Sequence, residues 1–224
     1  MLQPTAAPTF TTMSDAQFPA DAHERSRTRW RAAPPNEGLT WGRRVSGDAF
    51  IEKAASYGAF GDQRTVLEIG PGYGRLLRGC QDQSQPFRRY VAVDISEKNV
   101  TYLAREFARN DVAVVHGDVE TIELDDRFDT VISSLTLKHL YPSFLAALRN
   151  VRRYLNPGAL VIFDLVEGSL SEFAPVDEVT FSRWYSREEV AELLKEVPLA
   201  LVAFDAVEHA PDFRRLLVVA RNPD

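Results

Sequence analysis

The sequence predicts one α/β domain built around a mostly parallel sheet. Short apolar runs typical of buried strands alternate with amphipathic helical patterns over most of the chain. The run from Val66 to Arg75 joins a buried strand to a helix through three alternating glycines. A chain of 224 residues with 45% hydrophobic residues is also long enough to bury one substantial core.

The amino-terminal part differs from the rest of the chain. Residues 1–40 are rich in Pro, Ala, Thr, Ser and charge and have no sustained period, which predicts a flexible arm. Met1 and Met13 are both possible natural starts, and the sequence does not choose between them. We predict that residues 41–224 form the folded domain, beginning with a short helix capped near Ser46.

Strand and helix patterns then follow in order. Past the glycine loop, helical periodicity covers 100–107 and 144–155, and a capping box at 186–189 begins a further helix. Residues 169–177 are acidic and contain proline, which favours a flap that reaches to about residue 185. Strand patterns, each given with the residues that close it, are predicted at 66–69, 90–96, 112–119, 128–135, 159–166, 200–206 and 214–220.

The glycine loop predicts close contact between the backbone and a ligand. Glycine permits the positive φ angles of a sharp strand-to-helix turn and leaves no side chain between backbone and ligand. A dinucleotide fingerprint requires G-x-G-x-x-G, but its last glycine falls on Arg75 or Leu77 in the two possible registers. A P-loop requires Gly-Lys-Ser/Thr, which is absent after Gly74. Neither a nicotinamide or flavin site nor a phosphate loop is supported.

The remaining pattern, Glu68 followed by G-P-G-Y-G, resembles motif I of the class I S-adenosylmethionine-dependent methyltransferases. The resemblance implies a Rossmann-like, doubly wound sheet of seven strands, with helices on both faces and an antiparallel last strand between the fifth and sixth. It implies that Asp94 binds the ribose hydroxyls, that Asp118 contacts the adenine amino group, and that Ser134 lies beside the methionine part. The full set of implied cofactor-binding residues is Glu68, Gly70, Gly72, Gly74, Asp94, Ile95, Asp118, Val119 and Ser134.

Composition argues against several partners. The net charge of −6 gives no bulk attraction to phosphate backbones or anionic lipids, so nucleic acid is not expected as a substrate. The single cysteine, Cys80, lies on an apolar helix face, which favours a buried thiol. No apolar run reaches membrane-spanning length and no secretion signal is visible, so we expect a cytoplasmic protein without a membrane partner.

A hydroxyl acceptor requires a general base, and His139 is the first candidate because it follows the fourth strand. A structural role for its ring, bonded to backbone carbonyls, stays open. Lys138 either binds an anionic acceptor or extends to solvent, and it stands where several family members have an acid or a second histidine. His209 is a weaker candidate, since its loop placement is uncertain.

Aromatic residues are candidates for the acceptor wall. Trp184 and Tyr185 precede the capped helix, and Trp41 lies near the start of the domain. Each of the three has an alternative role in packing. Asp164 and Glu167 are too few acids for a magnesium site, so we expect metal-independent transfer to a small molecule, with oxygen favoured over nitrogen or carbon. A non-catalytic cofactor-binding protein and an oxidoreductase are the alternatives.

Overall fold

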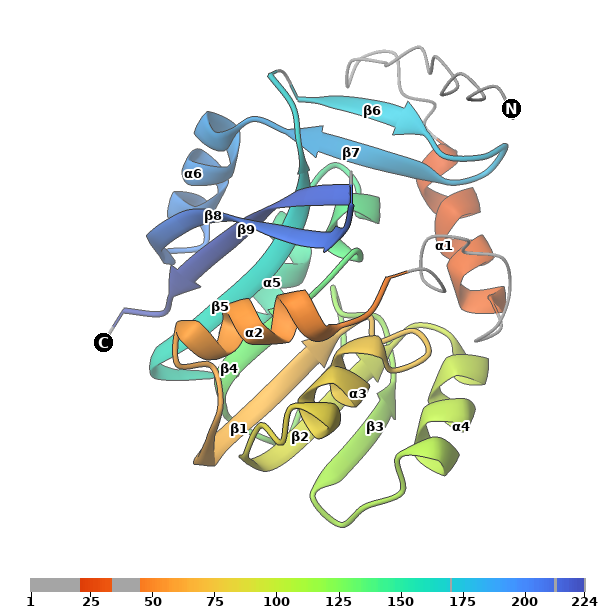
Figure 1. Cartoon of the computed structure of the whole chain (residues 1–224). Helices are drawn as coiled ribbons and strands as arrows, with labels where there is room; N and C mark the ends of the chain where they lie inside the picture. The colour runs from red at the N-terminus through yellow and green to blue at the C-terminus, as the bar shows by residue number, and fades with distance from the viewer. Residues whose placement is uncertain (1–20, 34–44, 170, 212, 224) are drawn as a thin grey trace, which may run out of the picture.

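The computed structural model describes residues 21–33, 45–169, 171–211 and 213–223, which form one twisted sheet with helices on both faces (Figure 1). The strands within these residues are β1 Gly61–Ile69, β2 Phe87–Asp94, β3 Val112–His116, β4 Phe128–Ser133, β5 Leu155–Glu167, β6 Glu172–Pro175, β7 Phe181–Tyr185, β8 Ala200–Ala210 and β9 Phe213–Arg221. The helices are α1 Ala22–Ala32, α2 Asp48–Ser56, α3 Arg75–Asp82, α4 Glu97–Glu106, the 3₁₀ turn η2 Leu137–His139, α5 Leu145–Arg152 and α6 Arg187–Glu196.

The strand order confirms the predicted topology. Strands β3, β2, β1, β4 and β5 run parallel in that spatial order, with the first strand of the chain at the centre. The last strand, β9, runs antiparallel between β5 and β8. The carboxyl ends of the parallel strands therefore meet at one edge, where open α/β sheets bind their ligands.

The sheet has nine strands in the described residues instead of the predicted seven, because the expected flap is a hairpin. Strands β6 and β7 pair antiparallel with each other, and β7 also pairs with the end of β5 through Val166 and Trp184. The hairpin thus extends the sheet beyond the carboxyl ends of the other strands (Figure 1). Its sequence has no long period, because each strand is only four or five residues long.

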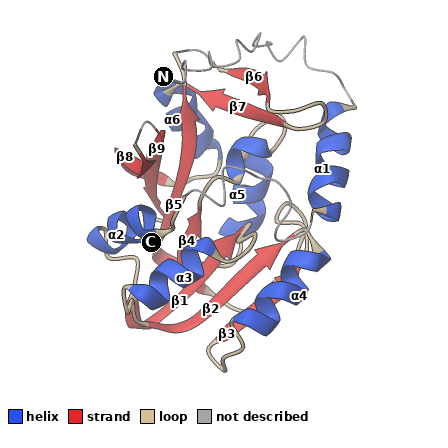
Figure 2. Cartoon of the chain, turned by 45° about the vertical axis from the view of Figure 1, so that its right-hand side comes forward, coloured by secondary structure: helices blue, strands red, loops and turns tan. Residues whose placement is uncertain are grey.

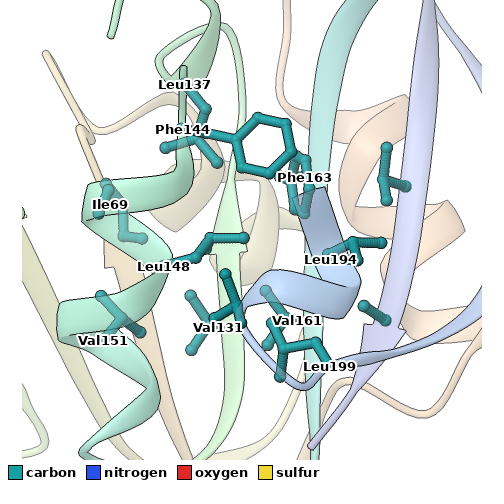
Figure 3. Packing of buried hydrophobic residues seen from close by; sticks show 14 of the residues in the cluster. Ile69, Val131, Leu137, Phe144, Leu148, Val151, Val161, Phe163, Leu194 and Leu199 are labelled. Atoms are coloured by element: carbon teal, nitrogen blue, oxygen red, sulfur yellow. The ribbon is translucent and has the colours of Figure 1, made fainter. Parts of the chain in front are cut away.

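Two apolar clusters hold the layers together, since successive strand residues point to opposite faces. Val66 faces α2, α3 and α4, and the helix residues in that cluster include Phe50 and Leu77. Leu67 faces α5 and α6, where Phe144, Leu148 and Leu194 close the other core (Figure 3). The Cys80 thiol is fully buried on α3, as the sequence predicts.

One part of the expected amino-terminal arm is ordered. Residues 22–32 form α1, whereas residues 1–20 and 34–40 of the expected arm lie outside the described residues. The helix lies beside the β6–β7 hairpin and α4 (Figure 2), and Ala22 packs against Phe173 and Phe181. Its order comes from contacts with the domain, such as the 2.6 Å hydrogen bond from Ser96 Oγ to the carbonyl of Ala33, which a local sequence pattern does not reveal. No helix among the described residues is long and apolar enough to cross a membrane.

Candidate active site

The glycine loop follows β1 directly and has the left-handed backbone that its sequence predicts. Gly70, Gly72 and Gly74 have φ angles of 66°, 59° and 84°. A Cβ on Gly74 would lie 2.4 Å from the Phe107 ring, and one on Gly70 would lie 2.4 Å from the Thr136 side chain. A Cβ on Gly72 would have no heavy atom within 4 Å. Two glycines therefore serve packing, while Gly72 borders open space at the carboxyl edge.

Glu68 lies beneath this loop and is buried. Its carboxyl group accepts a 2.6 Å hydrogen bond from the Tyr90 hydroxyl. Burial raises the pKa of Glu68 to about 7, although the Tyr90 hydrogen bond and the Arg75 charge both act in the opposite direction. The contacts of this side chain place it in the core under the loop, so any effect on a ligand passes through the loop.

Asp94 ends β2 and joins the loop to the next helix. Its Oδ2 accepts a 2.9 Å hydrogen bond from the Gly72 N–H, and its Oδ1 accepts bonds from the Ser96 N–H and from Asn99. Burial raises the pKa of the Asp94 carboxyl against these hydrogen bonds. The next residue, Ile95, has its carbonyl oxygen 3.2 Å from the His116 ring. The acid predicted to bind ribose therefore touches the open glycine of the loop.

Asp118 follows β3 and is covered by α1. Its carboxylate forms an ion pair with Arg27, which also pairs with Glu120, and the Arg31 guanidinium lies 3.9 Å away. The neighbouring Val119 carbonyl accepts a 3.0 Å hydrogen bond from Asn150. In this arrangement, with α1 docked on the domain, Arg27 pairs with Asp118, the acid that the resemblance assigns to the adenine amino group.

Ser134, just past β4, is the centre of a buried polar chain. Arg75, the first residue of α3, donates a 2.6 Å hydrogen bond to Ser134 Oγ, which in turn donates to Asp164 Oδ2. The Leu135 N–H and His209 also bond Asp164, at 2.7 Å each. Burial would raise the pKa of Asp164, but the hydrogen bond and electrostatic interaction with His209, together with the Ser134 and Leu135 hydrogen bonds, hold the pKa below its usual value. Ionised Asp164 thus links β5 to the loop after β4 and to His209 of β8.

Residues 67–163 match the family described as a methyltransferase domain. That segment runs from the strand before the glycine loop into β5, so it contains Glu68, Asp94 and Asp118 and ends one residue before Asp164. This part of the chain is thus a methyltransferase domain, and the chain has the fold of the class I S-adenosylmethionine-dependent methyltransferases. The resemblance seen in the sequence is therefore confirmed.

Related proteins act on different acceptors. The chain is 31% identical over 109 residues to the cypemycin N-terminal methyltransferase of Streptomyces sp, and 29% identical over 103 residues to the fatty-acid O-methyltransferase of Mycolicibacterium smegmatis. These alignments cover 47% and 45% of this chain, but only 43% and 36% of the relatives. The alignments thus span less than half of each relative's length, and the names of the two relatives give different methyl acceptors.

Solved structures agree on the fold. The 1,6-didemethyltoxoflavin-N1-methyltransferase of Burkholderia thailandensis, crystallised with S-adenosylhomocysteine, superposes with a TM-score of 0.74 at 21% identity and covers 98% of each chain. The glycopeptide N-methyltransferase MtfA with S-adenosylhomocysteine gives 0.67 at 19% identity, covering 80% of this chain and 91% of that one. Identities this low establish the shared fold alone.

Lys138 and His139 lie on the η2 turn after β4, as predicted. Burial, with the Arg215 and Arg75 charges, lowers the pKa of Lys138 to about 8. Burial and the Lys138 charge lower the pKa of His139 to about 3, although His139 Nδ1 bonds the Phe181 carbonyl. The His139 ring also packs 4.9 Å from the Trp30 ring of α1. The carbonyl contact matches the structural role left open by the sequence, and the catalytic role stays a prediction.

The predicted aromatic wall is only partly placed at the edge. Tyr185 is fully buried and packs on Phe144 at a ring distance of 5.3 Å, which is the packing alternative. Trp184 is half-buried at the end of β7, beside Val166, and Trp41 lies outside the described residues. Tyr185 thus packs in the core beside α5, and its contact with the methyl acceptor stays a prediction.

Sequence reasoning did not bring together two groups of this site. From the sequence, Asp164 was considered only as a possible magnesium ligand, which was rejected, and His209 only as a weak candidate for the general base. In the structure the two side chains form a 2.7 Å pair. Their partnership depends on the pairing of β9 between β5 and β8, which no local pattern shows. Among the described residues, no three His, Cys, Asp or Glu side chains gather as metal ligands would.

Proposed function

We propose that this chain uses S-adenosylmethionine to methylate a hydroxyl oxygen of a small molecule, without a metal. The observation that carries the proposal is the open space at the Cβ position of Gly72, directly beside Asp94. A ligand that lies against the backbone and offers hydroxyls to a carboxylate fits this edge. The alternatives are a binding protein without turnover and transfer to nitrogen or carbon.

The residues at the edge fit the cofactor. Gly72 leaves room for it, Asp94 would accept hydrogen bonds from its ribose hydroxyls, and Asp118 would accept from its adenine amino group once Arg27 shifts. Ser134 and the loop backbone, including that of Gly70 and Gly74, would line its methionine end. When bound, the cofactor would supply the methyl group carried by its positively charged sulfur, and the rest of the cofactor would leave as a neutral thioether.

The protein has to align the acceptor and exclude water. Alignment of two reactants supplies about 7–11 kcal/mol of a barrier. Helix α1 and the β6–β7 hairpin lie over the same edge and are joined by Ala22 and Phe173, so together they can close the site. Trp184 and Lys138 are the residues we place nearest the acceptor.

We favour oxygen as the methyl acceptor because two histidine rings, His139 and His209, lie near this edge, and each has its tautomer set by a hydrogen bond to a neighbouring residue. The carbonyl of Phe181 accepts from His139, and the carboxylate of Asp164 accepts from His209, so each ring has one nitrogen left to accept a proton. A hydroxyl acceptor has to lose a proton during transfer, and such a base contributes about 10²–10⁴-fold. We therefore place the acceptor hydroxyl on this side of the edge.

Matched acceptors test the proposal. Purified protein is incubated with S-adenosylmethionine and with phenol, 4-hydroxybenzoate or octanol, each beside an amine of similar shape, aniline, 4-aminobenzoate or octylamine. Release of S-adenosylhomocysteine and the mass of the product are measured. We expect methyl ethers from at least one hydroxyl compound. Products from the amines alone would assign nitrogen, and cofactor binding without turnover would favour the non-catalytic alternative.

The remaining expectations belong to the same proposal. We propose a small-molecule acceptor and a cytoplasmic site of action, and no role for nucleic acid, since the net charge is −6. An oxidoreductase would quench nicotinamide fluorescence on titration with the reduced dinucleotide, and we expect no quenching.

A further inference from the structure

His209 lies at an irregularity of the β8–β9 ladder. Glu208 pairs with Arg214 and Ala210 pairs with Phe213, so β8 contains one more residue than β9 at this point, and that residue is His209. Such a bulge redirects a side chain and is common next to active sites. Here it turns the His209 ring inward onto Asp164, a central residue of β5.

The pair has a defined proton arrangement. Asp164 accepts from His209 Nε2, from Ser134 Oγ and from the Leu135 N–H, so its oxygens are held as an ionised carboxylate. Nε2 of His209 therefore carries a proton, and Nδ1 keeps its lone pair in the neutral ring. The His209 side chain is fully buried, and within the described part of the chain its Nδ1 has no hydrogen-bond partner.

A buried nitrogen without a partner is costly, since such an unmade hydrogen bond costs about 1–3 kcal/mol. The centroid of the His209 ring lies 5.6 Å from that of the Phe213 ring, and a phenyl ring has no polar atom that could bond Nδ1. A hydroxyl placed against Nδ1 would restore the missing bond. Because the ring is fully buried in this closed arrangement, an acceptor reaches it only when the segments around it move apart.

The chain of hydrogen bonds also connects this ring to the cofactor loop. Arg75 follows Gly74 directly and bonds Ser134, which bonds Asp164, which bonds His209. The charged groups around the pair come from three elements: Arg75 from α3, Lys138 from η2 and Arg215 from β9. These cations favour the ionised oxygen that an acceptor becomes as it loses its proton.

We propose that His209, oriented by Asp164, is the general base that removes the proton from the acceptor hydroxyl. This inference rests on the proposed function. The lone pair of Nδ1 takes the proton, the O–H electron pair stays on the acceptor oxygen, and that oxygen becomes the nucleophile. The imidazolium that results faces the Asp164 carboxylate and returns its proton to water after the product leaves.

The other imidazole is less suited to this task. A general base acts best when its pKa lies near the working pH. Burial and the charge of Lys138 lower the pKa of His139 to about 3, so its ring holds a transferred proton weakly at neutral pH. Its contact with Trp30 of α1 fits a role in shaping the turn beneath the closed helix.

The first test needs no acceptor. The chain has four histidines, so long-range ¹H–¹⁵N spectra of labelled wild-type protein resolve each ring. We expect His209 as the Nε2–H tautomer in the wild type and a loss of that single tautomer in Asp164→Asn. A wild-type His209 ring that carries its proton on Nδ1 at neutral pH would overturn the proposal, whether or not turnover is found.

The second test separates the base from the cofactor site. His209→Gln keeps an amide able to donate to Asp164, and Glu208→Gln changes an exposed neighbour on the same strand as a matched control. Calorimetry with S-adenosylhomocysteine should give affinities within about twofold for both variants, since neither touches the cofactor. With the best of phenol, 4-hydroxybenzoate and octanol, we expect kcat of His209→Gln to fall about 10²–10⁴-fold.

The pH profile distinguishes a base from a structural residue. The wild type and Glu208→Gln should gain activity as pH rises through one ionisation, and His209→Gln should lose that acidic limb. A His209→Gln protein that keeps kcat within about threefold and the same limb would overturn the proposal. A wild type that binds no S-adenosylhomocysteine would instead defeat the proposed function itself.

Discussion

The backbone N–H of Gly72 donates a 2.9 Å hydrogen bond to Oδ2 of Asp94, which joins the open point of the glycine loop to the acid at the end of β2. Gly72 lies in the loop after β1 and Asp94 ends β2, and these neighbouring parallel strands pair Ile69 with Val93. A ligand that enters here meets bare backbone and a carboxylate together. This pair is the physical basis of the proposed cofactor site.

The glycines of the loop should respond differently to alanine. Both Gly72→Ala and Gly74→Ala place a Cβ on left-handed backbone, which costs about 1–2 kcal/mol. Gly74→Ala also drives its Cβ into Phe107 and Leu103, so it should lose a further 1–3 kcal/mol or so of unfolding free energy. Gly72→Ala should instead weaken S-adenosylhomocysteine binding by at least about tenfold, or about 1.4 kcal/mol. Urea unfolding and calorimetry on both variants check this contrast, and equal affinities would contradict it.

Glu68 should make the protein less stable as pH rises. Its pKa is raised from 4.5 to about 7 in the folded state, so the folded protein binds this proton more tightly than the unfolded chain. Its contribution to stability is therefore present below about pH 4.5 and is lost as pH rises to about 7, by about 3 kcal/mol in all. Glu68→Gln should remove this slope. Urea unfolding of the wild type and of Glu68→Gln would be compared at pH 5 and pH 8. If the free energy of unfolding changed equally with pH in the two proteins, the raised pKa of Glu68 would be disproved.

His139 should make the protein less stable as pH falls, opposite to the effect of Glu68. Its folded-state pKa is lowered from 6.5 to about 3, so the unfolded chain binds the proton more tightly and stability is lost as pH falls below about 6.5. Relative to His139→Gln, the wild type should lose about 2 kcal/mol of unfolding free energy between pH 7 and pH 5. This loss partly cancels the Glu68 slope in the wild type, so each single variant is needed to expose it. Identical unfolding curves for wild type and His139→Gln at both pH values would count against a neutral His139 ring.

Arg27 should hold α1 on the domain through Asp118 and Glu120. Loss of about 1 kcal/mol of docking free energy raises the open population about fivefold. Arg27→Ala should therefore increase the rate of tryptic cleavage within α1 about fivefold, because Arg29 and Arg31 remain as cleavage sites. Arg25→Ala is the matched control, since Arg25 pairs only with Asp21 in the described contacts of the same helix. Equal cleavage rates for the two variants would show that Arg27 does not secure the helix.

The sequence reveals the parts of this protein that local chemistry determines. The loop at Gly70 to Gly74 and the acids Asp94 and Asp118 were visible because strand ends, turns and acids follow one another along the chain. The topology followed from resemblance, and β9 does lie antiparallel between β5 and β8. These features need only short stretches of sequence to be seen.

The missed features depend on contacts between distant residues. Helix α1 is ordered by Arg27 and Ser96, which lie far apart in the sequence, and its own residues are mostly polar. The β6–β7 hairpin consists of strands too short to show a period. The Asp164–His209 pair joins residues 45 positions apart across a bulge, and single-sequence patterns contain no signal for such a pair.

Calorimetric titration with S-adenosylhomocysteine tests the central claim most directly. The wild type should bind one molecule per chain, and Asp94→Ala should bind at least about tenfold more weakly, because a hydrogen bond to a charged group contributes about 1.5–3 kcal/mol. Asp62→Asn, at an exposed position of β1, should bind like the wild type. A wild type that does not bind, or an Asp94→Ala protein with unchanged affinity, would contradict the cofactor site described at the carboxyl edge of the sheet.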